Sequence, residues 1–491
     1  MNLAVKILAW PVDADDVLPL ALWDAGTVAA ATGGAASGEF QASGVEIDSR
    51  DVVPGDLFFA LRGESMDGHR FIDAAFAKGA VAAVVDRPID RPHVLVQDTS
   101  TALELLAKVA RNRTEARIIG VTGSVGKTGV KEAIFAALER SSRGAAHRSV
   151  KSYNNHVGVP LSLARMPARS RFGVFEMGMN HAGEIALLTR QVCPHVAVIT
   201  TIAPAHIEML GSIEAIAAAK AEIFSGLEPG GVAVIPADSP QYGLLKDAAE
   251  QLGVATISFG TAAHADVRLL DAVLAHNGGS LVTVDLGERR MCYTVASPGK
   301  HWVANSLAVM AAVRAAGGDL GAAGLALAEM EGLKGRGARL DFTTGDGGTA
   351  LLIDESYNAN PASMRATLAQ LGATPARRRI AVLGAMKELG ELGPGFHAAL
   401  AEPIRAAGVD RLVLVGDEMR ALAKVLEDGE LGKSPLTALG NPLTFAHCET
   451  AQQAHEALLA IGLEGGDVVL VKGSNSVGLG GLVAALAGKE G

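Results

Sequence analysis

The sequence is poor in aromatic residues, and this shortage limits the folds that it can adopt. Phe, Trp and Tyr make up 4% of the 491 residues, whereas hydrophobic residues make up 49% and glycines number 58. Small aliphatic side chains are typical of parallel sheets covered by alanine-rich helices, so we expect an α/β protein. The length exceeds what one hydrophobic core accommodates, which predicts several domains.

Cysteine and clustered positive charge are also scarce. The three cysteines, Cys193, Cys292 and Cys448, have no metal-ligand spacing, which excludes a disulfide scaffold and fits a reducing compartment. The formal charge is -10 and no basic run is present, so nucleic acid is not an expected partner. Residues 1–16 resemble neither a signal peptide nor a spanning helix, so we expect a cytoplasmic protein without membrane insertion.

The most informative segment is residues 117–128, where an apolar strand runs into Gly-Ser-Val-Gly-Lys-Thr. Glycines let backbone N–H groups face an anion, the helix that follows adds its positive end, and a threonine hydroxyl can bind Mg²⁺. The residues expected to contact phosphate or its metal are Gly123, Ser124, Gly126, Lys127 and Thr128. An ordinary glycine turn is the alternative, and Val121 stands where a strict Walker motif has glycine.

Two polar, basic stretches at 111–117 and 332–339 divide the chain. They predict three domains, at 1–113, 114–333 and 334–491. Because apolar strands alternate with helices, we expect a central P-loop domain with a parallel sheet and a C-terminal Rossmann-like domain. A helix is expected over 21–32, and strands are expected at 57–61, 81–85, 118–121, 173–175, 196–199, 350–353, 380–383, 412–415 and 468–471.

Two further polar side chains follow strands of the central domain. Glu176 ends one strand and His206 comes a short loop after another, so both would lie at the carboxyl edge of the sheet, where ligands bind. Glu176 there can hold Mg²⁺, although a helix cap or a surface carboxylate fits the same pattern. A hydrogen-bonded structural histidine is the alternative for His206.

Lys220 lies on the apolar stripe of a helix expected over 212–224, which Ser212 would cap. Its ammonium group either reaches water along its stem or is partly buried. A partly buried lysine loses proton affinity, and the neutral amine can take up CO₂ to form a carbamate. Such a carbamate would offer two oxygens to Mg²⁺ beside Glu176 and His206.

Motifs at 122–128, 175–178, 205–208 and 219–224 occur together and in this order. By these motifs the chain resembles the Mur ligases, ATP-dependent amide-forming enzymes of peptidoglycan precursor synthesis. The segment 354–364, with Tyr-Asn-Ala-Asn-Pro, and the segments 382–390 and 471–474 are similar to the branch that joins D-alanyl-D-alanine to UDP-N-acetylmuramoyl-tripeptide. Residues 48–50, 54–61 and 67–71 resemble its nucleotide-sugar domain.

The resemblance implies ATP and Mg²⁺ as cofactors, an acyl phosphate intermediate and a monomer. It gives catalytic roles to Lys127, Lys220 and His206, and metal contacts to Thr128, Glu176, His206 and Lys220. Asn305, Arg336 and Asp354 would contact the adenine, the phosphates and the ribose, in that order. The substrate contacts would be Ser49, Arg50, Asn154, Asn155, Asn358 and Asn360. A solvated arginine, a turn carboxylate and an Asx-type turn at 357–360 are the plain alternatives in the third domain.

Other functions stay open at this point. A sister ligase that adds a diamino acid, a folylpolyglutamate synthase, a P-loop NTPase switch or motor, and a noncatalytic nucleotide-sugar binding protein all share part of the pattern. Three departures from the family also stand out: Gly129 replaces a threonine or serine, Ala385 an aspartate, and Asn475 an arginine.

Overall fold

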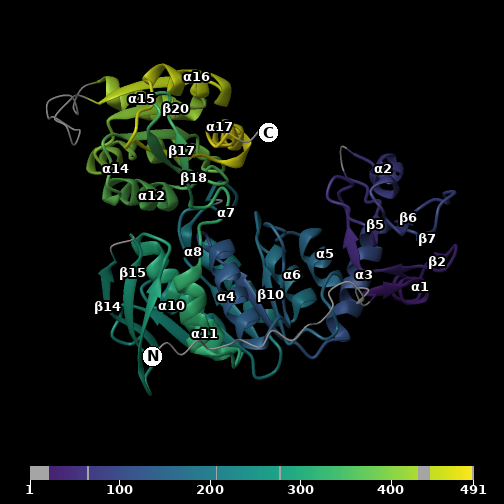
Figure 1. Cartoon of the computed structure of the whole chain (residues 1–491). Coiled ribbons are helices and arrows are strands. Elements are labelled where there is room, and N and C mark those ends of the chain that lie inside the picture. The colour runs from purple at the N-terminus through teal and green to yellow at the C-terminus, as the bar shows by residue number, and fades with distance from the viewer. Residues whose placement is uncertain (1–20, 64–65, 206, 276–277, 429–442, 489–491) are drawn as a thin grey trace, which may run out of the picture. The chain divides into compact units, whose positions relative to one another are not determined.

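The computed structural model describes residues 21–63, 66–205, 207–275, 278–428 and 443–488. The described chain forms two compact units (Figure 1). One contains the described residues up to Thr114 together with Pro160–Ala168, and the other contains Glu115–Val159 and the residues from Arg169 onward. The expectation for residues 1–16 lies outside the described residues. None of the described helices combines the length and the apolar character needed to cross a membrane.

The first unit is built on a sheet of five described strands. Their order is β2 (Ala35–Ala36), β7 (His93–Leu95), β6 (Ala82–Val85), β5 (Asp56–Phe59) and β4 (Gly44–Glu46). A second pair is β1 (Trp23–Asp24) with β3 (Gln41–Ala42), and the helical elements are α1 (Ala25–Thr32), η1 (Gly68–Phe71), α2 (Ile72–Ala77) and α3 (Thr99–Asn112). Phe58, Ala75 and Val85 are fully buried in the core of this unit.

The helix expected from residue 21 begins later, at Ala25. Asp24 caps it by accepting a hydrogen bond of 2.8 Å from the backbone N–H of Thr27, and Trp23 pairs with Ala42 as a short strand. The helix ends as expected, because Gly33 adopts φ 67°, a left-handed conformation that glycine takes easily.

The second unit begins with a sheet of nine described strands. Their order is β16 (Arg290–Val295), β15 (Ser280–Asp285), β14 (Val267–Leu274), β13 (Ala255–Gly260), β12 (Val232–Pro236), β11 (Val196–Ile199), β8 (Arg117–Thr122), β10 (Phe172–Glu176) and β9 (Ala146–Arg148). From β9 to β14 neighbouring strands are parallel, and β14, β15 and β16 are antiparallel. The sheet is therefore mixed, where the sequence predicted a parallel one.

Strand β8 lies where the chain changes direction across this sheet. The chain goes from β8 to β9 and β10 on one side, then crosses to β11 on the other. Such a switch point leaves a crevice outside the carboxyl ends of the strands, and open α/β sheets bind ligands there. The loop after β8 is the glycine-rich segment that the sequence predicts to hold phosphate.

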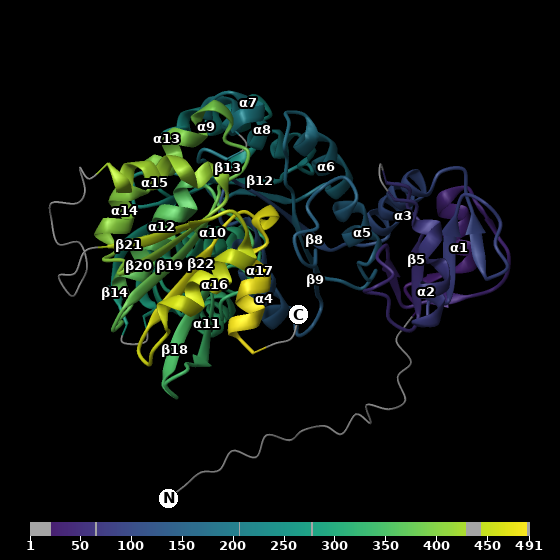
Figure 2. The ribbon, with the colours of Figure 1, turned by 90° about the horizontal axis from the view of Figure 1, so that it is seen from above.

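Three helices cover one face of this sheet: α4 (Lys127–Ser142), α10 (Lys300–Ala315) and α11 (Leu320–Glu329). In Figures 1 and 2 the three helices lie together. Helix α10 is buried on nearly every side from Ser306 to Val313, so it forms the centre of the core. The remaining helical elements around the sheet are α6 (Glu184–Val192), α7 (Ile207–Leu210), α8 (Ile213–Ala221), η2 (Glu222–Gly226) and α9 (Tyr242–Gln251). Helix α5 (Gly158–Ala164) belongs to the first unit from Pro160 onward.

The helix expected over 212–224 starts where the sequence predicts, but its α-helical part ends earlier, at Ala221. Ser212 caps α8, since its hydroxyl oxygen accepts a 3.1 Å hydrogen bond from the N–H of Ala215. The last turn tightens into the 3₁₀ helix η2 after Ala221.

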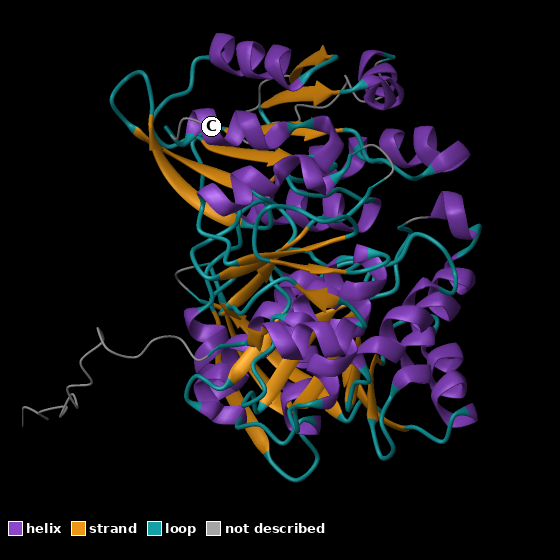
Figure 3. Cartoon of the chain, turned by 90° about the vertical axis from the view of Figure 1, so that its right-hand side faces the viewer, coloured by secondary structure: helices purple, strands orange, loops and turns teal. Residues whose placement is uncertain are grey.

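The rest of the second unit is a sheet of six described strands. Their order is β17 (Ala338–Thr343), β18 (Thr349–Glu355), β22 (Val468–Lys472), β19 (Arg379–Gly384), β20 (Arg411–Val415) and β21 (Thr444–Cys448). All neighbouring pairs are parallel except β17 with β18. Helices and strands alternate along this segment, and Figure 3 shows helices in purple on both sides of the strands in orange, which confirms the Rossmann-like expectation.

Helices pack on both faces of this second sheet. The helical elements are α12 (Pro361–Ala373), η3 (Gly390–Leu392), α13 (Gly393–Ala398), α14 (Ala401–Ala406), η4 (Asp417–Met419), α15 (Arg420–Glu427), α16 (Ala451–Ile461), η5 (Asn475–Val477) and α17 (Leu479–Leu486). Buried residues of α16 and α17, such as Leu458 and Leu482, pack against Val413 and Val469 of the sheet. The strand positions expected for this domain lie within β18, β19, β20 and β22.

Candidate active site

The loop between β8 and α4 has the conformation of a phosphate cradle. Gly126 adopts φ 87°, and a Cβ atom added there would lie 2.8 Å from Oδ1 of Asn305. Only glycine therefore fits this position without moving Asn305. Because α4 starts at Lys127, the N–H groups of its first turn face the cavity described below.

The loop after β11 holds the cradle in place through hydrogen bonds. Ser124 donates its hydroxyl hydrogen to the carbonyl of Ala203 at 2.9 Å and accepts from the N–H of Ala203 at 3.0 Å. Thr200 donates to the carbonyl of Val125 at 2.6 Å. The backbone N–H of Ser124 also donates to the carbonyl of Thr201 at 2.8 Å. Both the side chain and the N–H of Ser124 therefore hold the loop in place.

Glu176 is the centre of a polar cluster at the end of β10. The carboxylate is 1% exposed, and its Oε2 accepts a 2.8 Å hydrogen bond from the hydroxyl of Thr128. Its Oε1 accepts a 2.8 Å hydrogen bond from the side-chain amide of Asn154. The register between β10 and β8 pairs Glu176 with Val121, which places the carboxylate beside the start of the phosphate loop.

Lys220 is buried, with 2% of its surface exposed, and it lines the same cavity. No hydrogen bond or ion pair of its side chain is found within the described part of the chain. Burial lowers the pKa of Lys220 well below its usual value, and the positive charge of Lys127 lowers it further. Of the two readings of the sequence, the structure therefore favours a buried amine over one that reaches water.

Lys127 lies against the loop that precedes it. Its Nζ donates to the carbonyl of Gly123 at 2.7 Å. Burial lowers the pKa of Lys127, the carboxylate of Glu176 opposes this change, and the charge of Arg336 adds to it. An anion bound in the cavity would therefore stabilise the charged ammonium group of Lys127.

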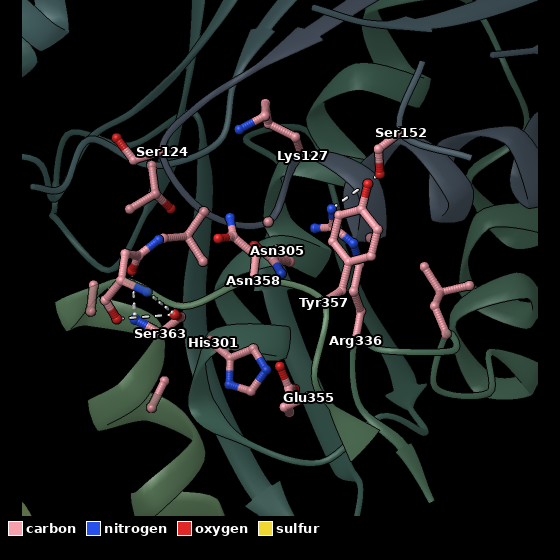
Figure 4. Close-up of a pocket in the computed structure, with 18 of the residues that line it drawn as sticks. Ser124, Lys127, Ser152, His301, Asn305, Arg336, Glu355, Tyr357, Asn358 and Ser363 are labelled. Carbon is pink, nitrogen blue, oxygen red and sulfur yellow. Dashed lines mark hydrogen bonds between the residues drawn. The ribbon is translucent and has the colours of Figure 1, made fainter. Parts of the chain in front are cut away.

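Residues from the six-stranded sheet complete the site. Arg336 donates from Nη2 to the hydroxyl oxygen of Ser152 at 3.1 Å, and its guanidinium lies 4.3 Å from the ring centre of Tyr357 (Figure 4). Asp354 is buried beneath them. Its carboxylate accepts from the N–H of Gly335 at 2.7 Å and from the hydroxyl of Ser356 at 2.6 Å.

These groups surround a cavity of about 460 Å³. Among the described residues that line it, the cations are Lys127, Arg336 and Lys472, the carboxylates are Glu176 and Glu355, and Lys220 adds its buried amine. Cations outnumber carboxylates, so the cavity suits a polyanionic ligand. Figure 4 shows Lys127, Asn305, Tyr357 and Asn358 among the residues that line it.

Sequence comparisons agree with this arrangement. Residues 41–114 match the profile "Mur ligase family, catalytic domain", residues 121–313 match "Mur ligase middle domain", and residues 338–475 match "Mur ligase, glutamate ligase domain". The UDP-N-acetylmuramoyl-tripeptide--D-alanyl-D-alanine ligase of Synechocystis sp. is 38% identical over 89% of this chain and 90% of its own length. The chain belongs to the Mur ligase family.

Solved structures agree as well. The chain is similar to MurF from Acinetobacter baumannii, with a TM-score of 0.79 and 29% identity over 96% of this chain and all of the other. It is also similar to MurF from Thermotoga maritima in complex with ADP, with a TM-score of 0.71 and 26% identity over 90% and 96% of the two chains. The three-domain fold expected from the sequence is thereby confirmed, with N-terminal, middle and C-terminal Mur ligase domains.

Several cavity residues of this Mur ligase were missed from the sequence. Glu355 and Lys472 end the paired strands β18 and β22 at matching register positions, and Lys472 Nζ lies 3.3 Å from Glu355 Oε2. Lys472 also donates to the carbonyl of Asn358 at 2.9 Å. Burial lowers the pKa of Lys472, which the Glu355 carboxylate opposes. The sequence signal for Lys472 is a lysine that follows the apolar run 468–471.

His301, at the start of α10, lines the cavity near this pair (Figure 4). Burial lowers the pKa of His301, the carboxylate of Glu355 raises it, and the charge of Lys472 lowers it. The imidazole is therefore neutral near pH 7 and can donate or accept one hydrogen bond.

Most of the residues expected at the site line the cavity, and some of them also hold its surroundings in place. Asn154, Asn305, Asn358 and Asn360 line it, together with Ser124, Gly126, Lys127, Glu176, Lys220 and Arg336. Asn360 caps α12 by accepting a 2.9 Å hydrogen bond from the N–H of Ser363. Asn155 is exposed and accepts from the N–H of Gly158 at 2.9 Å, at the start of α5.

The remaining expected residues lie elsewhere or are not described. Ser49 and Arg50 belong to the first unit, where Ser49 is 9% exposed and Arg50 forms an ion pair of 2.6 Å with Asp48. His206 lies outside the described residues. Gly123, Thr128 and Asp354 are close to the cavity residues through the hydrogen bonds above but do not line the cavity themselves.

One departure from the family has a clear structural reason. A Cβ atom at Gly129 would lie 2.8 Å from Cη2 of Trp302, so the indole of α10 fills the space that a threonine or serine would need. The other two departures, Ala385 and Asn475, are close to each other, since the N–H of Ser474 donates to the carbonyl of Ala385 at 3.2 Å and Asn475 begins η5. Nothing in the described structure explains these two substitutions.

Proposed function

We propose that the chain is an ATP-dependent ligase that joins D-alanyl-D-alanine to the terminal carboxylate of UDP-N-acetylmuramoyl-tripeptide. One observation carries the proposal: a single cavity brings the Gly126–Lys127 turn, Glu176 and the buried Lys220 together with the 357–360 segment. The Synechocystis relative has this activity in its name, and the Thermotoga maritima structure contains ADP. The first supports the reaction, and the second supports nucleotide binding at the cradle of this chain.

The charges of the cavity fit the difficult step of such a reaction. A carboxylate has to approach a triphosphate, and both are anions. Lys127 and Arg336 both line the cavity and would offset this repulsion in a site of low dielectric. The same cations would stabilise the charge that spreads over the phosphoryl oxygens in the transition state.

The residues present also fit a magnesium ion. Within the described part of the chain, no three His, Cys, Asp or Glu side chains form a ready-made metal cluster. Thr128 and Glu176 already bring a hydroxyl and a carboxylate within 2.8 Å of each other, and both are hard oxygen donors of the kind that Mg²⁺ selects. Bound there, Mg²⁺ would neutralise charge on the phosphates.

Lys220 would contribute to the same site as a carbamate. Three observations support this modification: the amine is buried, its pKa is lowered, and no described side chain pairs with it. Reaction of the neutral amine with CO₂ forms an N–C bond and releases a proton, which leaves an anion with two oxygens. His206, expected as a further ligand, stays a prediction because it lies outside the described residues.

The chemistry then has two steps. An oxygen of the tripeptide carboxylate forms a bond to the γ-phosphorus while the bond to the bridging oxygen of ADP breaks, which gives an acyl phosphate. The amine of the dipeptide attacks the acyl carbon, phosphate leaves, and the amine loses a proton. No protein nucleophile is needed, so the chain acts by holding both substrates in place and by its charges.

The substrate contacts stay predictions. Ser49 and Arg50 would bind the nucleotide sugar, Asn154 and Asn155 the muramoyl peptide, and Asn358 and Asn360 the dipeptide. Asn305 would contact the adenine and Asp354 the ribose. The domain boundaries, the monomer and the cytoplasmic location also stay predictions.

The test is phosphate release from ATP with UDP-N-acetylmuramoyl-tripeptide, measured with and without D-alanyl-D-alanine, while the muramoyl product is followed by mass. We expect release that requires both substrates and a mass gain of one dipeptide less water. Lys127→Ala is the inactive control for contaminating ATPases.

Other outcomes would reject the proposal in distinct ways. Release without the dipeptide and without a new product would indicate an NTPase. Release only with a diamino acid in place of the dipeptide would assign the chain to a sister ligase.

A further inference from the structure

Lys131 is a charged residue that is completely enclosed by the protein. It lies one turn after Thr128 in α4 and exposes 0% of its surface. Its Nζ donates to the carbonyl of Ser149 at 2.8 Å and to the carbonyl of Lys151 at 3.0 Å. It also lies 2.8 Å from Oε1 of Glu132. All three donors of the ammonium group are therefore used, as a buried charge requires.

The two carbonyls belong to residues 149–154, here called the 149–154 loop. The loop is also attached to β10, because Ser149 donates its N–H to the carbonyl of Val174 at 3.0 Å. The hydroxyl of Ser149 accepts from the N–H of Glu176 at 3.1 Å. Lys151 adopts φ 51°, which a residue with a side chain rarely takes. Because the ammonium group of Lys131 donates to the carbonyls of both Ser149 and Lys151, it helps to stabilise this unusual turn.

The far end of the loop reaches the active site. Asn154 donates from its side-chain amide to Glu176 at 2.8 Å, and its carbonyl accepts from the N–H of Gly178. Ser152 accepts the hydrogen bond from Arg336, as Figure 4 shows. The loop thus contacts both the candidate metal ligand and Arg336, which precedes β17. Nothing in its sequence pattern assigns a role to Lys131.

We propose that Lys131 is a positioning residue for the magnesium–nucleotide complex. It fixes the 149–154 loop to the helix of the phosphate cradle, so that Asn154 orients the Glu176 carboxylate toward Thr128 and Ser152 orients Arg336. Lys131 touches no substrate and acts through these residues. The inference rests on the proposed function, because it assumes that the cradle binds a nucleotide with Mg²⁺.

The experiment is calorimetric titration of the full-length chain with ADP at several Mg²⁺ concentrations. Lys131→Met keeps the length of the side chain but removes its donors. We expect the affinity for Mg·ADP to fall by about 10-fold or more, as for other residues that orient metal ligands, and the Mg²⁺ requirement to rise. Lys131→Gln keeps an N–H donor and is expected to lie between the wild type and Lys131→Met.

Two control variants separate positioning from stability. Leu138→Ala removes a buried side chain of the same helix without touching the loop, so it lowers the melting temperature but keeps the affinity for Mg·ADP. Glu132→Gln removes the charge beside Lys131 but leaves both bonds to the carbonyls, so it also keeps the affinity.

The outcomes separate this inference from the proposed function. Tight binding by the wild type and equal binding by Lys131→Met would overturn the positioning role alone. A loss of affinity in Leu138→Ala or Glu132→Gln as large as in Lys131→Met would overturn it too. If Lys131→Met does not fold, Lys131→Gln decides by the same comparison. No binding of Mg·ADP by the wild type would overturn both proposals.

Discussion

The hydroxyl of Thr128 donates to the carboxylate of Glu176 across 2.8 Å, although the two residues are 48 positions apart in the sequence. The first residues of α4 and the end of β10 meet because β8 and β10 are parallel neighbours. A threonine and a glutamate in this relation offer two of the oxygen donors that the proposed magnesium ion would need. The ligase proposal depends on this pair.

Loss of the Glu176 charge should abolish most of the activity. Glu176→Gln keeps the size of the side chain but removes its charge, and we expect kcat to fall by about 100-fold or more, as when one transition-state stabilising group is lost. The same variant should need more Mg²⁺ for half-maximal rate. Glu250→Gln, an exposed position in α9, is the control and should match the wild type. Equal rates for Glu176→Gln and the wild type would show that the charge of Glu176 plays no part in the reaction.

A side chain at Gly126 should block the nucleotide. Gly126→Ala places a Cβ atom 2.8 Å from Asn305 at φ 87°, so we expect binding of ADP to be lost. Gly144→Ala is a matched control, because Gly144 has the same φ of 87° and its nearest neighbour is 4.0 Å away. The control carries a backbone strain of about 1–2 kcal/mol but should bind ADP normally. Titration calorimetry on both variants makes the comparison.

The buried amine of Lys220 should make stability depend on pH. Its pKa in the folded chain lies well below the usual 10.5, so between the two values the unfolded chain binds more protons and stability rises with pH. In buffer without CO₂, Lys220→Met should therefore melt at a higher temperature than the wild type at pH 7. The difference should shrink toward pH 10. Lys472, whose pKa burial also lowers, is present in both proteins and cancels, whereas the repulsion between Lys127 and Lys220 is part of the difference.

The same pair of proteins tests the carbamate. Added bicarbonate should raise the melting temperature of the wild type and leave that of Lys220→Met unchanged. A response of both proteins, or of neither, would contradict a carbamate at Lys220.

Much of the fold follows from the sequence because its strands are short apolar runs bounded by glycine or polar residues. The run at 196–199 is β11, and the runs at 118–121 and 468–471 lie within β8 and β22. The antiparallel strands β14 and β15 were missed, since several of their apolar residues face outward. Val273 is 54% exposed and Leu281 45%, so the alternation that marks a half-buried strand is blurred.

The site was predictable only as far as local patterns reach. The glycine turn carries its own chemistry, so Gly126 and Lys127 could be found from spacing alone. Glu355 and Lys472 could not be paired, because 117 residues separate them and only the order of β18 and β22 brings them together. For Asp354 the sequence left a turn carboxylate as the alternative, and the hydrogen bonds from Gly335 and Ser356 show its carboxylate holding a turn.

Removal of the Asp354 carboxylate should destabilise the second unit. Asp354→Ala leaves the N–H of Gly335 and the hydroxyl of Ser356 without their partner, and each unsatisfied buried group costs about 1–3 kcal/mol. We expect a lower urea midpoint of unfolding. Asp341→Ala, at an exposed position of β17, is the control and should leave the midpoint in place. A normal midpoint for Asp354→Ala would show that the turn holds without its carboxylate.

Gly129 and Trp302 should behave as a coupled pair. Gly129→Thr forces atoms into the indole ring and should lower the urea midpoint, whereas Trp302→Leu makes the space that the threonine needs. The double variant should then be more stable than the sum of the single changes predicts, with a coupling of about 0.5–3 kcal/mol. Additive effects would show that Trp302 does not determine the choice of glycine.

The most direct test of the ligase account uses UDP-N-acetylmuramoyl-tripeptide labelled with ¹⁸O in its terminal carboxylate. Attack of this carboxylate on the γ-phosphate carries one carboxylate oxygen into the phosphate that is released. We expect one ¹⁸O in the phosphate for each amide bond formed with D-alanyl-D-alanine. Phosphate without ¹⁸O, with oxygen from water instead, would contradict the acyl phosphate and identify a hydrolase.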